Sequence, residues 1–297
     1  MIGAVAERGE LALVVNPVAG GGRGARLAAP VAARLRGAGW GVEIIIGRSA
    51  ADADERLGAA VARGVVGIVA VGGDGIINQV AQHVAGTELA LGIVPAGTGN
   101  DLAGALALPA DPLAAADLIT SGRERRIDAC RTATGHWWVN VLGAGFDAAV
   151  NERGNRMRFP RGKRKYDLAI VAELGRLRAV PFTLTLDGVV REVPAVLVAV
   201  GNGSSYGAGM RMTPAAVLDD GVLDVTVIGP VSRRTLLRVF PGVYKGTHVT
   251  HPAVTTLRAR SVGLAAEGQV AYADGERIGP LPVTSTCVPG ALRLLGA

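Results

Sequence analysis

The sequence predicts an α/β protein in which a doubly wound parallel sheet is followed by a second, mostly antiparallel β domain. Within the first hundred residues, an apolar strand runs three times into a glycine loop that opens a helix. After Asp128 the pattern changes to short strand signals separated by turns. The 297 residues are 49% hydrophobic and 4% aromatic, and Ala, Val and Leu supply most apolar positions, as in α/β interiors. This length can bury one large or two moderate cores.

The first part of the chain, from Leu11 to about Ile127, alternates strands with helices. Strands are predicted at Leu11–Asn16, Val42–Ile46, Ile68–Val71 and Leu91–Val94. Helices are predicted near Gly24–Gly37, Ala51–Arg63, Ile76–Val84, Asp101–Leu106 and Pro112–Ser121. The third of these helices has apolar residues at i, i+3 and i+4 spacing. In a doubly wound sheet, ligands bind at the carboxyl ends of the strands.

The second part of the chain carries mostly strand and turn signals. Strands are predicted at Trp137–Leu142, Phe182–Leu186, Val189–Val193, Ala195–Gly201, Leu223–Ile228, Val254–Ala259 and Gln269–Ala273. Helices are predicted near Lys165–Arg178 and Ser232–Tyr244, and Asp187-Gly188 is a hairpin signature. We therefore predict a first domain at residues 1–128, to which residues 281–297 can return, and a second at residues 129–280.

Three glycine loops follow strands of the first domain, at Pro17–Gly24, Gly72–Gly75 and Pro95–Asn100. Parallel strands end at one edge of a sheet, so we expect these loops to lie side by side. Glycines let backbone N–H groups approach a ligand closely, and helix N-termini favour negative charge. Together the loops predict a phosphate site.

Taken singly, each loop also has a purely structural interpretation. Gly20 to Ala25 fits the dinucleotide fingerprint G-x-G-x-x-A, but Gly47-Arg48 stands where a ribose-binding acid would end the second strand. The first loop can equally be a turn without ligand. Asp74 can cap a helix, although an acid beside polyphosphate indicates a divalent cation or a transferable proton between them. Thr98 and Asn100 can donate to phosphate oxygens or belong to a simple N-cap.

A set of motifs in a fixed order extends these loops over nearly the whole chain. They are Asn16-Pro17, Gly72-Gly73-Asp74-Gly75 with Asn78, Pro95 to Asp101, Asn140 to Asp147, Gly201-Asn202, Tyr206 to Met210, Pro214, Asp219-Asp220-Gly221 and Asp274-Gly275-Glu276. In these residues the chain resembles the diacylglycerol-kinase-like lipid kinases (the catalytic domain of diacylglycerol, sphingosine and ceramide kinases), which are relatives of NAD kinase and phosphofructokinase.

The resemblance implies an N-terminal domain of the NAD-kinase and phosphofructokinase type, a C-terminal β-sandwich domain, and ATP in the cleft between them. By motif match it places ATP contacts at Asn16, Pro17, Val18, Ala19, Gly20, Gly72, Gly73, Asp74, Gly75, Ile76, Ile77, Asn78, Gly97 and Thr98, with Ser49 at the place of a family threonine.

The resemblance also assigns catalytic and metal roles. Glu276 would be the general base, with Asp74 and Asp274 as further catalytic residues. Asp220, with the main-chain oxygens of Val217 and Val222, would hold a magnesium ion, and Asp74, Asp101 and Asp128 would form an acidic network near the ATP-bound magnesium. Phosphoryl transfer requires charge neutralisation and alignment, and a lipid alcohol needs a base to remove its proton.

Two departures from the family pattern loosen the inference to diacylglycerol in particular. Ile76 follows the second glycine loop where many members have Thr, and Gln79 stands where Glu is frequent. Sphingosine- and ceramide-kinase relatives also carry an apolar residue at the first place, so kinase activity is compatible with both.

A basic segment accounts for the net charge of +6. It comprises seven residues, Arg153, Arg156, Arg158, Arg161, Lys163, Arg164 and Lys165, without which 24 basic residues face 25 acidic ones. It is interpreted as a solvated charged loop or as a docking site for an anionic membrane, with nucleic-acid binding less favoured because few aromatics and no known motif surround it.

The sequence thus favours an ATP- and magnesium-dependent kinase of a membrane lipid alcohol, most of all diacylglycerol. The alternatives are a soluble small-molecule kinase of the NAD-kinase kind and a non-catalytic nucleotide-binding regulator. There is no apolar run long enough to span a membrane and no secretion signal, and Cys130 and Cys287 lack metal-ligand spacing. We expect a cytoplasmic protein bound peripherally to the inner face of the membrane, with buried cysteine thiols, and leave a homodimer open.

Overall fold

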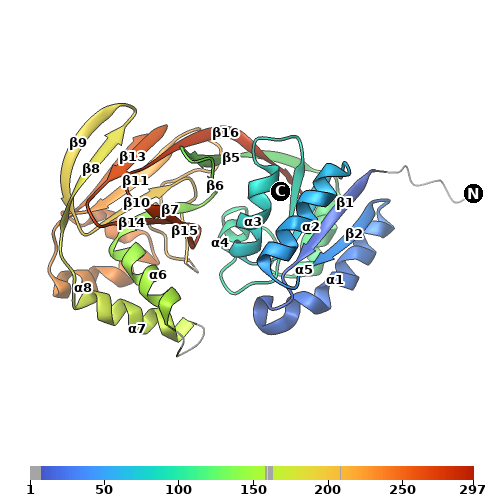
Figure 1. The fold of residues 1–297 in the computed structure, drawn as a ribbon, viewed down its shortest axis with the longest axis horizontal. Coiled ribbons are helices and arrows are strands. Elements are labelled where there is room, and N and C mark those ends of the chain that lie inside the picture. The colour runs from blue at the N-terminus through green and yellow to red at the C-terminus, as the bar shows by residue number, and fades with distance from the viewer. Residues whose placement is uncertain (1–7, 158, 160–162, 208) are drawn as a thin grey trace, which may run out of the picture. The chain divides into compact units, whose positions relative to one another are not determined.

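The computed structural model describes residues 8–157, 159, 163–207 and 209–297 (Figure 1), without the side chains of residues 163–165 and 167. The chain forms two compact units. Unit 1 is the described part of Met1–Ala129 together with Val288–Ala297, and unit 2 is the described part of Cys130–Cys287.

Unit 1 is built on a parallel sheet with strand order β2-β1-β3-β4. Its strands are β1 (Glu10–Val15), β2 (Gly41–Ile46), β3 (Gly67–Gly72) and β4 (Ala90–Pro95), all mutually parallel where they pair. The last residues of β16 (Val283–Leu295) add a further parallel neighbour beside β4. Every residue of β3 and β4 is buried, as expected where helices cover both faces of a sheet. The predicted α/β fold class is confirmed.

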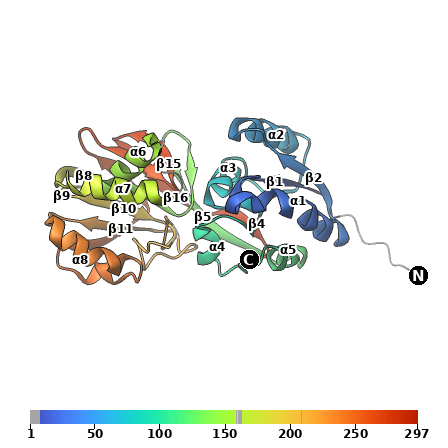
Figure 2. The ribbon, with the colours of Figure 1, turned by 90° about the horizontal axis from the view of Figure 1, so that it is seen from below.

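Helices cover the two faces of this sheet. They are α1 (Ala19–Gly37), α2 (Ala50–Ala62), α3 (Asp74–Val84), α4 (Asp101–Ala105) and α5 (Pro112–Thr120). Figure 2 shows α1 and α5 together on one side and α2 and α3 on the other, and each pair is in mutual contact. Val31 and Leu35 of α1 pack with the β1 side chains of Leu11 and Leu13 in a continuous apolar core.

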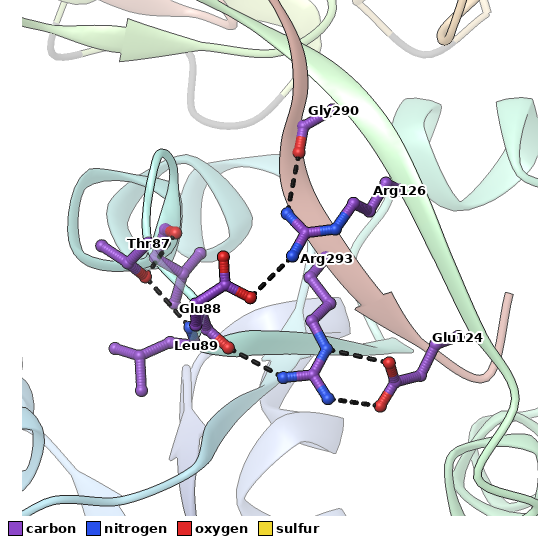
Figure 3. Close-up of polar contacts among 8 residues, drawn as sticks. Thr87, Glu88, Leu89, Glu124, Arg126, Gly290 and Arg293 are labelled. Carbon is purple, nitrogen blue, oxygen red and sulfur yellow. Dashed lines mark hydrogen bonds and ion pairs between the residues drawn. The ribbon is translucent and has the colours of Figure 1, made fainter.

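A group of ion pairs joins β5 (Glu124–Thr132), β16 and the turn before β4 within unit 1 (Figure 3). Arg293 of β16 makes a two-pronged contact with Glu124, at 2.6 and 2.9 Å, and donates to the Glu88 carbonyl. Arg126 of β5 pairs with the Glu88 carboxylate at 2.7 Å and donates to the Gly290 carbonyl. The Arg293 contact lowers the pKa of Glu124. These contacts tie the end of the chain to unit 1.

Unit 2 consists of two antiparallel sheets. One has the order β12-β11-β10-β7-β14-β15, and the other continues from β16 through β13 and β8 to β9, with β5 beside β16 and β6 beside β5. Side chains of both sheets form one core, in which Phe182 and Leu264 pack with Val198 and Val225. The strands are β6 (Trp137–Trp138), β7 (Val141–Gly145), β8 (Val180–Leu186), β9 (Val189–Ala195), β10 (Leu197–Gly201), β11 (Leu223–Ile228), β12 (Val254–Ala259), β13 (Ser261–Ala265), β14 (Val270–Ala273) and β15 (Glu276–Pro280). This is the predicted sandwich-like second domain.

Three helices lie on the same side of the unit 2 strands in Figure 1, and Figure 2 shows them in front. They are α6 (Phe146–Arg156), α7 (Lys163–Leu174) and α8 (Arg233–Val243), and a 3-10 turn, Thr247–Thr250, follows α8. Helix α6 was not predicted, since the apolar pattern there is interrupted by charges. Arg153 and Arg156 therefore lie on a helix, whereas Arg158 and Arg161 lie outside the described residues.

The predicted strand Trp137–Leu142 is wrong in its continuity. It is divided into β6 and β7 because the backbone N–H groups of Val139, Asn140 and Val141 bind the Asp274 carboxylate. Trp138 is fully buried, and its indole N–H donates to Ser285 Oγ at 3.1 Å. Cys130 and Cys287 form no disulfide and are buried, as predicted. Among the described residues, no helix is long and apolar enough to cross a membrane.

Candidate active site

The three glycine loops of unit 1 touch one another at the carboxyl edge of its sheet. A Cβ atom on Gly97 would lie 2.4 Å from Gly73 Cα, and one on Gly20 would lie 2.5 Å from the Ala96 carbonyl oxygen. The Gly72 carbonyl accepts from Ala96 N–H at 2.8 Å. The second loop thus contacts the third, and the third contacts the first, which confirms that the loops lie side by side. At these positions glycine is required by close backbone packing.

Two helices that begin at this edge have no side-chain cap. The residues before α1 and α3, Val18 and Gly73, make no capping hydrogen bond, whereas Ser49 caps α2 and Asp111 caps α5. Gly20, Gly21 and Gly22 in the first loop have φ of 55°, 70° and 92°, and Cβ atoms on the last two would meet only open space. Uncapped helix N-termini leave amide donors for an anion.

Polar side chains at the edge divide into those that hold the loops and those that face outward. Asn16 Oδ1 accepts from Val18 N–H at 3.1 Å, and Asn100, with φ of 55°, closes its own loop through two hydrogen bonds to Gly97. Thr98 is exposed. Asn78 is buried, and its Nδ2 has no hydrogen-bond partner among the described residues. Thr98 and Asn78 thus remain donors for a ligand, while Asn100 has a structural role.

Three other residues that were predicted to contact ATP, Ile76, Ile77 and Ser49, make contacts within unit 1. The side chains of Ile76 and Ile77 are buried, and their amides both donate to the Gly73 carbonyl. Ile76 Cγ2 would lie 2.6 Å from a Cβ on Gly72, so Ile76 packs against the glycine loop. Ser49 Oγ accepts from Asp52 N–H at 3.1 Å as the cap of α2. The predicted roles of these residues in ATP binding gain no support from their contacts.

The acidic residues of unit 1 that were predicted to lie near magnesium differ in their contacts and burial. Asp74 Oδ1, in the first turn of α3, accepts from Leu102 N–H at 3.3 Å. Asp101 begins α4 next to that amide and is buried. Asp128 is buried in β5, and its Oδ1 accepts from Gly290 N–H at 2.8 Å, so it anchors the chain end.

No cluster of three or more His, Cys, Asp or Glu side chains suited to a metal exists in the described parts of the chain. Magnesium bound with a nucleotide needs only one or two carboxylates, because phosphate oxygens and water complete its coordination. Asp74 and Asp101 fit that requirement beside the glycine loops.

In unit 2, Glu276 is presented by a tight hairpin between β14 and β15. Asp274 and Gly275 have φ of 50° and 85°, as a type I′ turn requires. Ala273 pairs with Glu276 across the turn, which leaves the Glu276 side chain exposed. Both oxygens of Asp274 accept from backbone amides of residues 139–141, at 2.7 to 3.1 Å. Asp274 thus fixes the hairpin that carries Glu276.

His136 lies within electrostatic reach of Glu276. Burial lowers the pKa of His136, while the Glu276 charge raises it. Its Nε2 is buried without a hydrogen-bond partner among the described residues. The lowered pKa favours an uncharged imidazole within electrostatic reach of the carboxylate.

The predicted magnesium ligand Asp220 is partnered by an arginine. Its Oδ1 accepts from Val222 N–H at 3.1 Å, and its Oδ2 pairs with the Arg258 guanidinium. Arg258 also faces Asp224, at 3.4 Å between Nε and Oδ2, and both aspartates raise the pKa of Arg258. In this structure Arg258 thus pairs with one carboxylate oxygen of Asp220, and a magnesium ion held by Asp220 with the main-chain oxygens of Val217 and Val222 stays a prediction.

An apolar pocket in unit 2 was not assigned from the sequence. Its cavity volume is about 70 Å³, and it is lined by side chains of α6, α7, α8, β10, β11 and β12 and of loops between them. Its one carboxyl group is Asp147, which packs against Gly143 and is hydrogen-bonded by Tyr206. Burial raises the pKa of Asp147 to about 6. The sequence signal was present only as the motif residues Asp147, Tyr206 and Met210, to which no role was given.

Comparison with known proteins agrees with both units. Residues 10–132 match the diacylglycerol kinase catalytic domain, and residues 140–296 match the YegS C-terminal NAD kinase beta sandwich-like domain. A protein named diacylglycerol kinase from Mycobacterium tuberculosis is 42% identical over 295 residues, covering 97% of this chain and 96% of that protein.

More distant relatives agree with this result. A YegS-like relative from Stenotrophomonas maltophilia is 30% identical over 272 residues, covering 87% of this chain and 88% of that protein. A crystal structure of a Bacillus anthracis protein, 26% identical, superposes with a TM-score of 0.78 over 96% of both chains. The chain therefore belongs to the diacylglycerol kinase catalytic-domain family and is a lipid kinase.

Proposed function

We propose that this lipid kinase transfers the γ-phosphoryl group of ATP to the hydroxyl group of diacylglycerol. The observation that carries the proposal is the edge of unit 1, where three glycine loops and two uncapped helices present backbone donors together. The named Mycobacterium tuberculosis relative, similar over nearly its whole length, supports diacylglycerol as the acceptor.

Unit 1 binds the triphosphate through its main chain. Amides at the starts of α1 and α3, other than those of Ile76 and Ile77, donate to phosphate oxygens, and Thr98 and Asn78 add side-chain donors. Asp74 and Asp101 hold the magnesium ion of the nucleotide. When bound, the ion neutralises charge on the phosphate oxygens and aligns the transferring group.

Glu276 of unit 2 accepts the proton of the lipid hydroxyl. The hydroxyl oxygen forms a bond to the γ-phosphorus as the bond from that phosphorus to the β–γ bridging oxygen breaks, leaving ADP and a lipid phosphate monoester. Asp274 is a positioning residue, since its hydrogen bonds hold the turn that presents Glu276. His136 keeps an uncharged ring beside Glu276, because burial lowers its pKa.

The apolar pocket of unit 2 holds acyl chains of the substrate. Its lining is almost wholly apolar, with Phe146, Leu236 and Phe240 among its side chains. Asp147, the one carboxyl group of the lining, is the kind of polar group that can orient an ester-linked glycerol at the end of an apolar site. This pocket favours a lipid acceptor over a polar metabolite.

The basic segment, residues 153–165, contributes to membrane association at the inner leaflet. Its described members are partly neutralised, because Arg153 pairs with Glu173 and Arg156 with Glu152. These two ion pairs leave Arg153 and Arg156 less available to anionic lipid.

Transfer of labelled γ-phosphate tests the proposal. The purified chain, supplied with ATP and magnesium in mixed micelles, should phosphorylate diacylglycerol faster than sphingosine, ceramide or monoacylglycerol. Glu276→Gln should lower kcat by about 10²–10⁴-fold while leaving ATP affinity unchanged. Glu267→Gln, an exposed acid in the turn before β14, at the other end of that strand from Glu276, is the matched control. A full rate in Glu276→Gln would exclude Glu276 as the base, and preference for another lipid alcohol would exclude diacylglycerol as the main substrate.

A further inference from the structure

Helix α8 has two faces of different chemistry. Its inner face lines the apolar pocket with Thr235, Leu236, Val239, Phe240 and Val243. Its outer face, extended by two residues beyond the helix, carries Arg233, Arg234, Leu237, Arg238, Pro241, Tyr244 and Lys245, all of them exposed. This spacing follows the helical period, so the cations and apolar side chains of the outer face form one stripe.

All the charged side chains of the stripe are arginine or lysine. Between Asp224 and Glu267 the sequence contains no Asp or Glu. No carboxylate of the described residues forms an ion pair with Arg234, Arg238 or Lys245, unlike Arg153 and Arg156 on α6. Arg233 donates to the Gly175 carbonyl that follows α7, an uncharged partner that leaves its charge uncompensated.

Apolar side chains stand among these cations and on the neighbouring helix. Leu237 is 57% exposed and Tyr244 45% exposed. On α7, Leu168 and Val171 are 51% and 68% exposed. Leucine, valine and tyrosine beside arginine and lysine are typical of helices that lie in the interface of an anionic bilayer.

We propose that the outer face of α8 is a membrane-docking surface, which lies flat on an anionic leaflet with Leu237 and Tyr244 between the headgroups. The inference rests on the proposed function, because a lipid acceptor must leave a bilayer to be phosphorylated. Since the other face of the same helix lines the pocket, docking places the pocket lining directly behind the surface that touches lipid. Acyl chains then pass beside α8 without crossing bulk water.

Vesicle co-sedimentation without nucleotide tests the charge requirement. The full chain should bind vesicles of equal parts phosphatidylcholine and phosphatidylglycerol and not phosphatidylcholine alone. Arg234→Glu/Arg238→Glu should weaken that binding at least about tenfold. Arg191→Glu/Arg260→Glu changes the net charge equally at exposed sites of the unit 2 strands and should bind within about twofold of the unsubstituted chain. Equal loss in both variants, or none in the α8 variant, would overturn the proposal.

Insertion is measured separately with fluorescence. Leu237→Trp should show emission quenched by brominated phosphatidylglycerol vesicles, beyond the quenching of the native tryptophans. Val190→Trp, at a comparably exposed position on β9, should show none. Quenching no greater at residue 237 than at residue 190 would contradict contact between α8 and the acyl region.

Activity on a soluble substrate separates this surface from the proposed chemistry. With a short-chain diacylglycerol below its aggregation limit, Arg234→Glu/Arg238→Glu should keep the unsubstituted rate, while its rate on vesicles falls with binding. Loss of both rates would overturn a purely docking role. A chain that phosphorylates no diacylglycerol but still shows α8-dependent vesicle binding would reject the proposed substrate and retain the surface.

Discussion

The ligand edge of unit 1 and the pocket of unit 2 are built from different parts of the chain. At the edge of unit 1, close backbone contacts between Gly73 and Gly97 and uncapped helix ends present main-chain donors. The pocket of unit 2 is made of side chains from six helices and strands far apart in the sequence and from loops between them, with one carboxyl group among mostly apolar side chains. A site formed by closely packed backbone atoms tolerates almost no increase in residue size. A site formed by side chains can change its shape through single substitutions. The family can thus keep one phosphate donor while the acceptor varies.

The largest expected effect comes from adding one methyl group to the backbone site. In Gly97→Ala the new Cβ would meet Gly73 Cα at 2.4 Å, and a backbone cannot rotate away as a side chain can. We expect a loss of about 3 kcal/mol in the free energy of unfolding and at least about a hundredfold weaker ATP binding. Thermal unfolding and titration calorimetry measure these two quantities.

Gly75→Ala is the matched substitution, because a Cβ there would meet open space in the first turn of α3. It should stabilise the helix by about 0.5–1 kcal/mol, yet weaken ATP binding if phosphate approaches this turn. Stability and affinity then move in opposite directions. Unchanged ATP affinity in Gly75→Ala would place the triphosphate elsewhere, and normal stability of Gly97→Ala would contradict the loop contact.

The same contrast explains how far the sequence alone could predict this protein. The glycine loops could be found in the sequence because a site made of backbone atoms requires glycine at fixed positions. The parallel direction of β1, β3 and β4 followed from the alternation of strands and helices. The Glu276 turn also has a backbone requirement, because Asp274 and Gly275 both have positive φ.

Side-chain partners could not be predicted in this way. Leu236 and Phe240 look like ordinary core residues until the fold places them around a cavity. The pairing of Arg258 with Asp220 joins residues 38 positions apart, and nothing in the spacing indicates it. Helix α6 was missed because its charges, including Arg153 and Arg156, hide a weak apolar pattern, and those charges pair with acids only in the folded chain.

An intermediate effect is expected from the one carboxyl group of the pocket. Burial raises the pKa of Asp147 from 3.8 to about 6, although the Tyr206 hydrogen bond opposes this change. The folded state therefore holds the proton more tightly than the unfolded chain. The contribution of the Asp147 carboxyl to the free energy of unfolding is fully present below about pH 4. It declines as the pH rises and is lost above about pH 6. Part of the side chain can be reached by solvent through the pocket, so we expect a loss of about 2 kcal/mol.

Asp147→Asn should remove this pH dependence, because the amide stays neutral. Its free energy of unfolding, from urea titrations between pH 4 and pH 8, should exceed that of the unsubstituted chain above pH 6 and equal it near pH 4. Glu55→Gln, an exposed acid on α2, is the control and should leave the pH profile unchanged. Parallel profiles for Asp147→Asn and the unsubstituted chain would show that the carboxyl is solvated.

The smallest effect concerns the arginine at the predicted magnesium site. Burial and the nearby Asp220 charge raise the pKa of Asp224, and Arg258, which is about half exposed, opposes this change. Arg258→Gln should therefore cost about 1 kcal/mol of stability. If the Arg258 guanidinium replaces a structural cation, the unfolding temperature of the unsubstituted chain should be the same in EDTA and in magnesium. Only Arg258→Gln should then be stabilised by magnesium. The control Arg191→Gln should respond to neither. Destabilisation of the unsubstituted chain by EDTA would mean that a metal holds the Asp220 loop and that Arg258 moves aside for it. Unit 2 would then depend on an ion bound to main-chain oxygens and one carboxylate.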